Sequence, residues 1–526
     1  MISLNDLNLS IHRLPILKDV SFDIAQGRIF GLVGESGSGK SMTALALMQL
    51  LPQGFSASGQ VMVDGIDVLA LSEAEMCALR GNEIGMIFQE PMTALNPVQT
   101  IGAQVAETLL IHGKASKTEA TKVARHMLNR VGLPEDKFPS SRYPHELSGG
   151  QRQRVCIAMA IALRPKLLIA DEPTTALDVT TQAQILELLQ ELVAEEEMSL
   201  LLITHDLAVV AGMADYVAVM RKGEIVEQGP TEQLFKTMTH PYTKQLFEAS
   251  SHQPDHGTET QDTPILEVKS AIREYAVPRT KLFHRPPPFR AVNDVSFALM
   301  RGESLGLVGE SGCGKSTLTR AILGLDPLQG GEIRLSGEPV LAGQHMPAHL
   351  RQKVQVVFQD PYGSFNPRNK VLKLVTEPFH LTTPPANPRE HVAEALETVG
   401  MQADAMDRYI HEFSGGQRQR IAIARALVLH PDLIVLDEAV SALDVSIRAQ
   451  ILDLLADLQK RLGLSYLFIS HDLTVVQAIT DRVLVMQQGK IVETGQTEQV
   501  FTSPTHPYTK QLLDAAPQIP ADWQAR

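Results

Sequence analysis

The chain repeats itself, and this duplication constrains its fold more than any other feature of the sequence. GLVGESGSGKS at residues 31–41 returns as GLVGESGCGKS at 306–316, and SGGQRQR at 148–154 returns at 414–420. LLIADEPTTALDV and ITHDL recur in the same order as LIVLDEAVSALDV and ISHDL. A repeat of this length is too large for one unit of a solenoid. We therefore predict two copies of one domain.

The length of the chain agrees with two domains joined by a short linker. At 526 residues it exceeds what a single hydrophobic core usually supports. We predict a first domain over residues 1–250, a linker over 251–264 and a second domain over 265–526. The linker sequence, SHQPDHGTETQDTP, is polar and aperiodic, and a strand-like ILEV follows it. The proline-rich HRPPPF at 284–289 predicts a loop between early strands of the second copy.

Charge and composition exclude several classes of protein. The net charge of −13 argues against nucleic acid as the main partner, because binding to a phosphate backbone needs an excess of Lys and Arg. Three cysteines are too few and too scattered for a disulfide framework or a zinc site, which fits a reducing cytoplasm. We find no secretion signal and no run of 18 apolar residues, so we do not expect the chain to span a membrane itself.

Each copy carries a glycine-rich loop of the G-x-x-x-x-G-K-[ST] pattern between a strand-like and a helix-like run. Glycines let backbone N–H groups converge on phosphate oxygens, and the following helix adds the positive end of its dipole. We expect the lysines to reach the β- and γ-phosphates of a nucleotide and the last serines to ligate Mg²⁺. The predicted nucleotide-binding residues are Gly34, Ser36, Gly37, Gly39, Lys40 and Ser41, and Gly309, Ser311, Gly312, Gly314, Lys315 and Ser316.

A second pair of motifs ends an apolar run with Asp-Glu in each copy. LLIADE ends at Glu172 and LIVLDE ends at Glu438. In nucleotidases with such phosphate loops, an Asp that closes this strand holds Mg²⁺, so we assign this role to Asp171 and Asp437. The glutamates that follow lie one step nearer the γ-phosphate, and we predict that they polarise the attacking water.

LSGGQ and FSGGQ give the chain a resemblance to the ATP-binding-cassette family over almost its whole length. The resemblance implies an α/β fold with two tandem P-loop nucleotide-binding domains. Each would have a RecA-like α/β core, an antiparallel β subdomain and a helical subdomain. It also assigns further residues to catalysis and to nucleotide or metal binding. These are Gln89 and Gln359 (Q-loop, also Mg²⁺), Asp178 and Asp444 (D-loop), His205 and His471 (switch), and Ser148, Gly149, Gly150, Gln151, Ser414, Gly415, Gly416 and Gln417 (signature).

In this family the signature of one cassette closes over the nucleotide held by the other. The resemblance therefore implies two composite ATP sites formed by two cassettes that pair head to tail within this one chain. It implies two separate integral membrane permeases as partners, contacted through the helical inserts at residues 97–146 and 367–412. An external solute-binding protein would act only indirectly. The chain would then lie peripherally on the cytoplasmic face of the plasma membrane, with ATP and Mg²⁺ as its cofactors.

The octapeptide THPYTKQL occurs at residues 239–246 and again at 505–512. We predict a helix that docks on its own cassette, capped by Thr239 and with Pro241 in its first turn. HPYT after a cassette resembles the ATPases of peptide, opine and nickel importers, and a fused pair most resembles those of microcin C and oligopeptide importers. Peptide import is therefore the expected function, with nickel, an opine or glutathione as alternative solutes.

Two questions stay open at this point. Tyr275 resembles the aromatic residue that stacks on adenine in the family, but an ordinary strand tyrosine fits equally well, and the first copy offers only Ile11 or His12 there. Tandem cassettes without membrane spans also act on ribosomes. The ribosome-acting proteins have a long, charged, helical linker between their cassettes. In this chain the linker at residues 251–264 is short and not basic.

Overall fold

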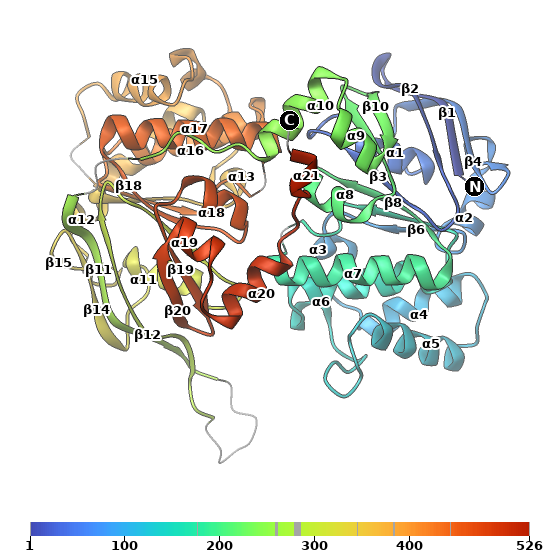
Figure 1. Ribbon diagram of the computed structural model, residues 1–526, viewed down its shortest axis with the longest axis horizontal. Helices are drawn as coiled ribbons and strands as arrows, with labels where there is room; N and C mark the ends of the chain where they lie inside the picture. Colours follow the sequence, from blue (N-terminus) through green and yellow to red (C-terminus); the bar gives the residue numbers. More distant parts are fainter. Residues whose placement is uncertain are drawn as a thin grey trace.

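The chain folds into two similar halves that lie side by side (Figure 1). The computed structural model describes residues 2–524, apart from residues 176, 258–260, 278–285, 344–345, 382–383 and 442. Part of the loop expected at 284–289 lies outside the described residues. Its remainder is irregular at 286–288, and a strand begins at Phe289.

Each half contains a four-stranded antiparallel sheet, which confirms the predicted β subdomain. The strand orders are β2-β1-β4-β5 and β12-β11-β14-β15. Alternate side chains of the long strands are buried, as in Leu7 and Leu9, because one face of such a sheet packs on the core. The strands are β1 (Ile2–Ile11), β2 (Leu14–Ile24), β4 (Phe55–Val63), β5 (Ile66–Asp67), β11 (Gln261–Tyr275), β12 (Phe289–Arg301), β14 (Gly330–Leu335) and β15 (Glu338–Pro339).

Each half also contains a six-stranded sheet, in the orders β10-β9-β3-β8-β7-β6 and β16-β17-β18-β13-β19-β20. All strands are parallel except the edge strands β10 and β20, which are antiparallel to their neighbours. Helices cover such sheets on both faces, which explains the unbroken buried runs such as IFGLV in β3. The strands are β3 (Ile29–Val33), β6 (Ile84–Ile87), β7 (Leu167–Asp171), β8 (Ser199–Thr204), β9 (Tyr216–Arg221), β10 (Glu224–Pro230), β13 (Ser304–Val308), β16 (Val354–Val357), β17 (Leu433–Asp437), β18 (Ser465–Ile469), β19 (Arg482–Gln487) and β20 (Lys490–Gln496).

The strand order brings the motifs together at one edge of each core sheet. In the first half β3 pairs with β8, and β8 pairs with β7, so the carboxyl ends of all three strands are adjacent. The phosphate loop follows β3, Asp171 ends β7, and His205 follows β8. Ligands of open α/β sheets bind at such carboxyl ends.

Helices form the remaining layers and a helical subdomain in each half. The first half has α1 (Lys40–Leu47), α2 (Glu73–Leu79), α3 (Pro91–Ala94), α4 (Ile101–Ile111), α5 (Lys117–Arg130), α6 (Gly149–Ala160), α7 (Val179–Glu196), α8 (Leu207–Met213), α9 (Thr231–Thr237) and α10 (Pro241–Ser250). The second half has α11 (Lys315–Ile322), α12 (Ala348–Lys353), α13 (Pro361–Ser364), α14 (Val371–Val375), α15 (Pro388–Thr398), α16 (Gly415–Leu427), α17 (Val445–Leu462), α18 (Leu473–Ile479), α19 (Thr497–Thr502), α20 (Pro507–Ala515) and α21 (Ala521–Gln524).

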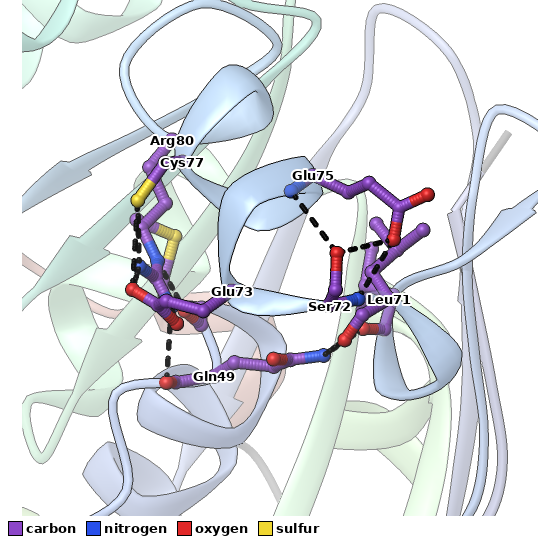
Figure 2. A network of polar contacts seen from close by, with 9 residues as sticks. Gln49, Leu71, Ser72, Glu73, Glu75, Cys77 and Arg80 are labelled. Carbon is purple, nitrogen blue, oxygen red and sulfur yellow. Dashed lines mark hydrogen bonds and ion pairs between the residues drawn. The ribbon is translucent and has the colours of Figure 1, made fainter.

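Polar contacts fasten helix α2 to the far end of the phosphate-loop helix α1 (Figure 2). Ser72 and Glu75 form a capping box at the start of α2, with Ser72 N–H donating to Glu75 at 2.8 Å. Arg80, just after α2, donates to the carbonyl oxygens of Met48 at 2.8 Å and Gln49 at 3.1 Å, beyond the end of α1. Arg80 also pairs with Glu73 at 2.5 Å and contacts Cys77 Sγ at 3.8 Å. These contacts hold the C-terminal end of the helix that carries Lys40.

The segment between the halves lies along the second half. Helix α10 ends at Ser250, and β11 begins at Gln261, four residues before the expected strand at Ile265. The strand starts early because Gln261 and Pro264 already pair with β12. His252 lies 2.6 Å from Asp453, and Lys460 lies 2.8 Å from Asp255, so the segment contacts α17.

The two halves exchange contacts in a reciprocal way. Helix α10 of the first half packs on α17 of the second, and α20 packs on α7. Val179 belongs to the hydrophobic core of the second half and Val445 to that of the first. The end of the chain returns to the first half, where helix α21 lies against α9 (Figure 1) and Trp523 packs on Phe235.

Candidate active site

The phosphate-loop lysines are buried beside the carbonyl oxygens of their own loops. Lys40 Nζ donates to Gly34 O at 2.7 Å and Glu35 O at 3.0 Å, and Lys315 makes the same contacts in its loop at 2.6 and 2.9 Å. Burial lowers the pKa of Lys40, although the charges of Glu172 and Asp444 oppose this. Asp444 belongs to the other half of the molecule, so both halves shape the field at Lys40.

Some glycines of each phosphate loop are tightly packed against the core, and others face open space. A Cβ at Gly34 would lie 2.2 Å from Met220 O, and one at Gly309 would lie 2.2 Å from Met486 O. A Cβ at Gly37 or Gly312 would meet nothing within 4 Å. Both open-side glycines have φ near +75°, which side chains rarely adopt. The loops therefore present backbone N–H groups on an open side, which fits the phosphates of ATP.

Ser41 and Asp171 lie together where a metal on the phosphates is expected. Ser41 Oγ donates to Asp171 Oδ1 at 3.1 Å. Burial raises the pKa of Asp171 to about 6, and burial also raises that of Asp437. A buried carboxylate beside a hydroxyl is an oxygen pair of the kind that Mg²⁺ prefers, so these residues fit the ion. When bound, Mg²⁺ would neutralise charge on the β- and γ-phosphate oxygens.

Glu172 is the centre of a polar cluster in the first half. Gln89 Nε2 donates to its carboxylate at 3.1 Å, Thr175 Oγ1 donates at 2.9 Å, and His205 Nδ1 lies 3.3 Å away. Burial alone would raise the pKa of Glu172, but the contacts with His205 and Thr175 and the charge of Lys40 lower it to about 2. The carboxylate is therefore ionised at neutral pH and can accept a hydrogen bond from water.

Glu438 repeats part of this arrangement. His471 Nδ1 lies 3.2 Å from its carboxylate, and this contact lowers the pKa of Glu438 in spite of its burial. Glu172 and Glu438 both have left-handed backbone conformations, with φ of 47° and 50°. Such strain in a residue other than glycine is typical of functional positions. Gln359, the counterpart of Gln89, lies on the surface.

The signature motifs begin helices α6 and α16. Ser148 and Gln151 form a capping box on α6, and Ser414 and Gln417 form one on α16. A Cβ at Gly150 would lie 2.2 Å from Thr181, and one at Gly416 would lie 2.5 Å from Ile447. Each signature is thus packed against the helix that follows its own D-loop, while Gly149 and Gly415 remain exposed. Their contact with nucleotide in the opposite cassette stays a prediction.

Two hydrogen bonds join the phosphate loop of one half to the D-loop region of the other. Ser36 N–H donates to Asp444 at 2.5 Å. Thr180 Oγ1, in the first turn of α7, donates to Glu310 at 2.8 Å. These contacts place the halves head to tail. The sequence did not reveal Thr180 or Glu310 as interface residues, because their partners are fixed only by the pairing of the halves.

Tyr275 ends strand β11 and is 38% exposed. The guanidinium carbon of Arg273 lies 4.7 Å from the centre of the Tyr275 ring, and the Tyr275 hydroxyl donates to Asp326 at 3.4 Å. In the first half Ile11 ends β1 and His12 follows it. Adenine stacking on Tyr275 stays a prediction.

The octapeptides form the first turns of α10 and α20, but the predicted cap was wrong. His240, not Thr239, caps α10, because its Nδ1 accepts the N–H of Tyr242 at 3.2 Å. Thr239 instead donates through its N–H and its hydroxyl to Glu227, both at 2.7 Å. Pro241 is the first helical residue, as predicted. The sequence did not reveal that the hydroxyl of Tyr242 contacts the phosphate loop.

Family models match both halves of the chain. A model described as "ABC transporter" matches residues 17–175 and 292–441. A second model, "Oligopeptide/dipeptide transporter, C-terminal region", matches residues 226–272 and 492–526, which include both octapeptides. The fold, the paired phosphate loops and these matches define an ATP-hydrolysing cassette protein. The chain belongs to the ABC transporter family.

Curated relatives resemble nearly the whole chain. "Glutathione import ATP-binding protein GsiA" of Salmonella choleraesuis (strain SC-B67) is 46% identical over 560 aligned residues, which cover 98% of this chain and 89% of the relative. The protein of the same name from Escherichia coli (strain K12) is 47% identical over 562 residues with the same coverage. The alignments therefore extend over both cassettes of this chain.

Solved structures of single cassettes are also similar. The "Dimeric Structure of MJ0796, a Bacterial ABC Transporter Cassette" is 32% identical, with a TM-score of 0.40, and covers 44% of this chain and 99% of that one. The structure of cbiO1 from Clostridium perfringens is 28% identical, with a TM-score of 0.41, and covers 46% and 92%. None of the helices in the described part of this chain is long and apolar enough to cross a membrane.

Proposed function

We propose that this chain is the energy-coupling ATPase of an importer for small peptides, and that glutathione is the first solute to test. The proposal is carried by relatives named for glutathione import that match 98% of the chain. Glutathione is a modified tripeptide, so it also agrees with the oligopeptide and dipeptide description of the C-terminal regions. Microcin C and longer peptides remain narrower alternatives within the same class.

The site residues divide the work of hydrolysis between them. Lys40 and the open side of its loop would hold the β- and γ-phosphates, and Ser41 with Asp171 would hold Mg²⁺, which would neutralise phosphate charge. Glu172 accepts a hydrogen bond from water and directs its oxygen at the γ-phosphorus. The water oxygen would bond to the γ-phosphorus as the bond from phosphorus to the bridging oxygen breaks; ADP would leave with the bridging oxygen, and the water's protons would leave with the inorganic phosphate. The lowered pKa of Glu172 keeps its carboxylate ionised, so that it can orient the attacking water.

The proposed partners are two separate permeases that dock on the helical subdomains. Large apolar side chains are exposed there beside the Q-loop, with Phe88 at 42%, Val98 at 79% and Ile111 at 73%. In the second half Phe358, the counterpart of Phe88, is 41% exposed, and Tyr409 is 39% exposed. Exposed apolar groups of this size favour a protein surface as partner. This proposal places the chain on the cytoplasmic face of the plasma membrane, with a solute-binding protein acting from the other side.

Growth on a defined sulfur source tests the proposal. Cells that contain this chain as their only glutathione-uptake ATPase are given glutathione as their sole source of sulfur. The wild-type chain should support growth and uptake of labelled glutathione, whereas the Glu172→Gln and Glu438→Gln double variant should not. Growth of the deletion strain at the wild-type rate would overturn the glutathione assignment.

A second arm distinguishes the solute classes. The same strains are given a tripeptide as sole nitrogen source and, separately, are assayed for uptake of labelled nickel. Loss of tripeptide use with intact glutathione uptake would move the assignment to oligopeptides. Loss of nickel uptake alone would contradict peptide import altogether.

A further inference from the structure

The tyrosine of each octapeptide contacts the phosphate loop of its own cassette. Tyr242 Oη accepts the backbone N–H of Glu35 at 3.3 Å, and Tyr508 Oη accepts that of Glu310 at 3.0 Å. Both tyrosines are almost fully buried, at 2% and 4% exposure. The contact occurs in both halves, between an octapeptide and a phosphate loop that are each repeated in the sequence, so it is a shared feature of the two cassettes.

The rest of the HPYT motif holds this tyrosine in place. Glu493, on strand β20, accepts the N–H and hydroxyl of Thr505, both at 2.7 Å, and the N–H of His506 at 3.1 Å. His506 Nδ1 in turn accepts the N–H of Tyr508 at 3.2 Å. Glu227 makes the equivalent set of contacts in the first half. A strand of the core sheet thereby fixes the direction of the tyrosine hydroxyl.

The same two helices also contact the other cassette. Helix α20 packs on α7 and helix α10 packs on α17, and α7 and α17 follow the two D-loops. Glu310 is hydrogen-bonded to both cassettes. Its N–H is bound by Tyr508 of its own cassette, and its carboxylate is bound by Thr180 of the other.

We propose that Tyr242 and Tyr508 are positioning residues for ATP, and that their helices link the order of each phosphate loop to the pairing of the cassettes. Each hydroxyl fixes the second residue of the loop, so that the N–H groups after it face the phosphates. The hydrogen bond is made whether ATP is in its ground state or its transition state. Its loss should therefore raise KM and leave kcat almost unchanged.

The test replaces each tyrosine with phenylalanine in the full chain. Tyr242→Phe and Tyr508→Phe remove only the acceptor oxygen, and a phenyl ring can still lie beneath Arg221, whose guanidinium is 4.5 Å from the ring of Tyr242. We expect the double variant to raise KM for ATP about 2- to 10-fold, the effect of one lost hydrogen bond per site. Lys244→Ala, at an exposed position on the same helix, is the matched control and should leave KM unchanged.

Three measurements decide between positioning and simple packing. The dissociation constant for ATP should rise by the same factor in a Glu172→Gln and Glu438→Gln background, where hydrolysis does not interfere. The Hill coefficient for ATP should fall toward 1, because the order of each phosphate loop would no longer be coupled to the pairing of the cassettes. A lower melting temperature with unchanged KM would overturn the positioning role. A raised KM with an unchanged Hill coefficient would overturn the link to pairing.

Discussion

The backbone N–H of Ser36 donates to the carboxylate of Asp444 at 2.5 Å, although the two residues lie 408 positions apart in the chain. Ser36 belongs to the phosphate loop of the first cassette and Asp444 to the D-loop of the second. Asp178, the equivalent of Asp444, instead caps its own helix α7 by accepting the N–H of Thr181 at 3.1 Å. The two interfaces are thus related but not identical, which allows the two ATP sites to differ.

The glutamates after β7 and β17 should be needed for turnover but not for binding. Glu172→Gln combined with Glu438→Gln keeps the shape of the site and the phosphate contacts while removing the charge that orients water. We expect phosphate release to fall by about 10²- to 10⁴-fold, with ATP retained in a closed form. Glu187→Gln, on the exposed side of α7, is the control and should hydrolyse ATP normally. Phosphate release at the normal rate from the double variant would contradict the assignment.

Tyr275 should make the second phosphate loop bind ATP more tightly than the first. Tyr275→Ala should weaken binding at that site by about 1–3 kcal/mol, or roughly one to two orders of magnitude, if the ring stacks on adenine. Tyr275→Phe keeps the ring and loses only the 3.4 Å contact with Asp326, so it should bind normally. Calorimetric titration measures both sites. Equal losses in the two variants, or none, would show that the ring is only structural.

Arg448 should stabilise the fold through a partly buried ion pair, which the first half cannot form because it has Gln182 at this position. Its guanidinium lies 2.7 Å from Asp472, with side chains 18% and 23% exposed. Arg448→Gln leaves the carboxylate of Asp472 without this partner and should cost about 1–3 kcal/mol. Urea unfolding measures the loss.

The control for this variant is an exposed pair. Arg389 lies 2.7 Å from Asp407 with both side chains 54% exposed, so Arg389→Gln should cost less than about 1 kcal/mol. Equal losses in Arg448→Gln and Arg389→Gln would contradict the importance of burial at Asp472.

Glu493 should give the stability of the second cassette a defined pH dependence. Partial burial would raise its pKa, but the contacts with Thr505 and the N–H of His506 lower it to about 2. Because this lies below the value of about 4.3 in an unfolded chain, the carboxylate stabilises the fold fully above pH 4.3 and progressively less toward pH 2.

Unfolding curves of Glu493→Gln across pH test this dependence. The variant should be less stable than wild type at pH 7, and the difference should shrink between pH 4.3 and 3. Glu498→Gln, at an exposed position on α19, should show no such trend. A deficit that grows as the pH falls would have the wrong sign for this explanation.

Duplication and local patterns predicted the architecture well, because each motif depends on residues close in sequence. The strand before Gly34, the loop itself and the helix after Ser41 all carry local signals, and the structure places them as expected. The predicted cap at Thr239 was wrong because Glu227, on a neighbouring strand, takes that hydroxyl. A local sequence pattern cannot show that Glu227 would bind the Thr239 hydroxyl in place of the helix N-terminus.

The contacts between cassettes could not be predicted from the sequence, because they also depend on segments that meet only in the folded structure. The octapeptide was visible as a repeat, and its helix was predicted, but the target of the Tyr508 hydroxyl depends on where β20 places the helix. Thr180 and Glu310 meet only after both cassettes have folded. The presence of the octapeptide in both copies is nevertheless a useful signal, because it marks residues such as Tyr508 for closer attention.

Pairing of the cassettes within one chain is the central claim, and disulfide cross-linking tests it most directly. Only Cys77 of the three native cysteines is exposed, so a Cys77→Ser background suffices. Ser36→Cys with Asp444→Cys should form a rapid bond within single chains, seen as a shift in mobility on a non-reducing gel. Ser36→Cys with Asp178→Cys, the D-loop of the same cassette, should not. Cross-linking of the second pair instead of the first, or bonds formed only between separate chains, would contradict the head-to-tail pairing described here.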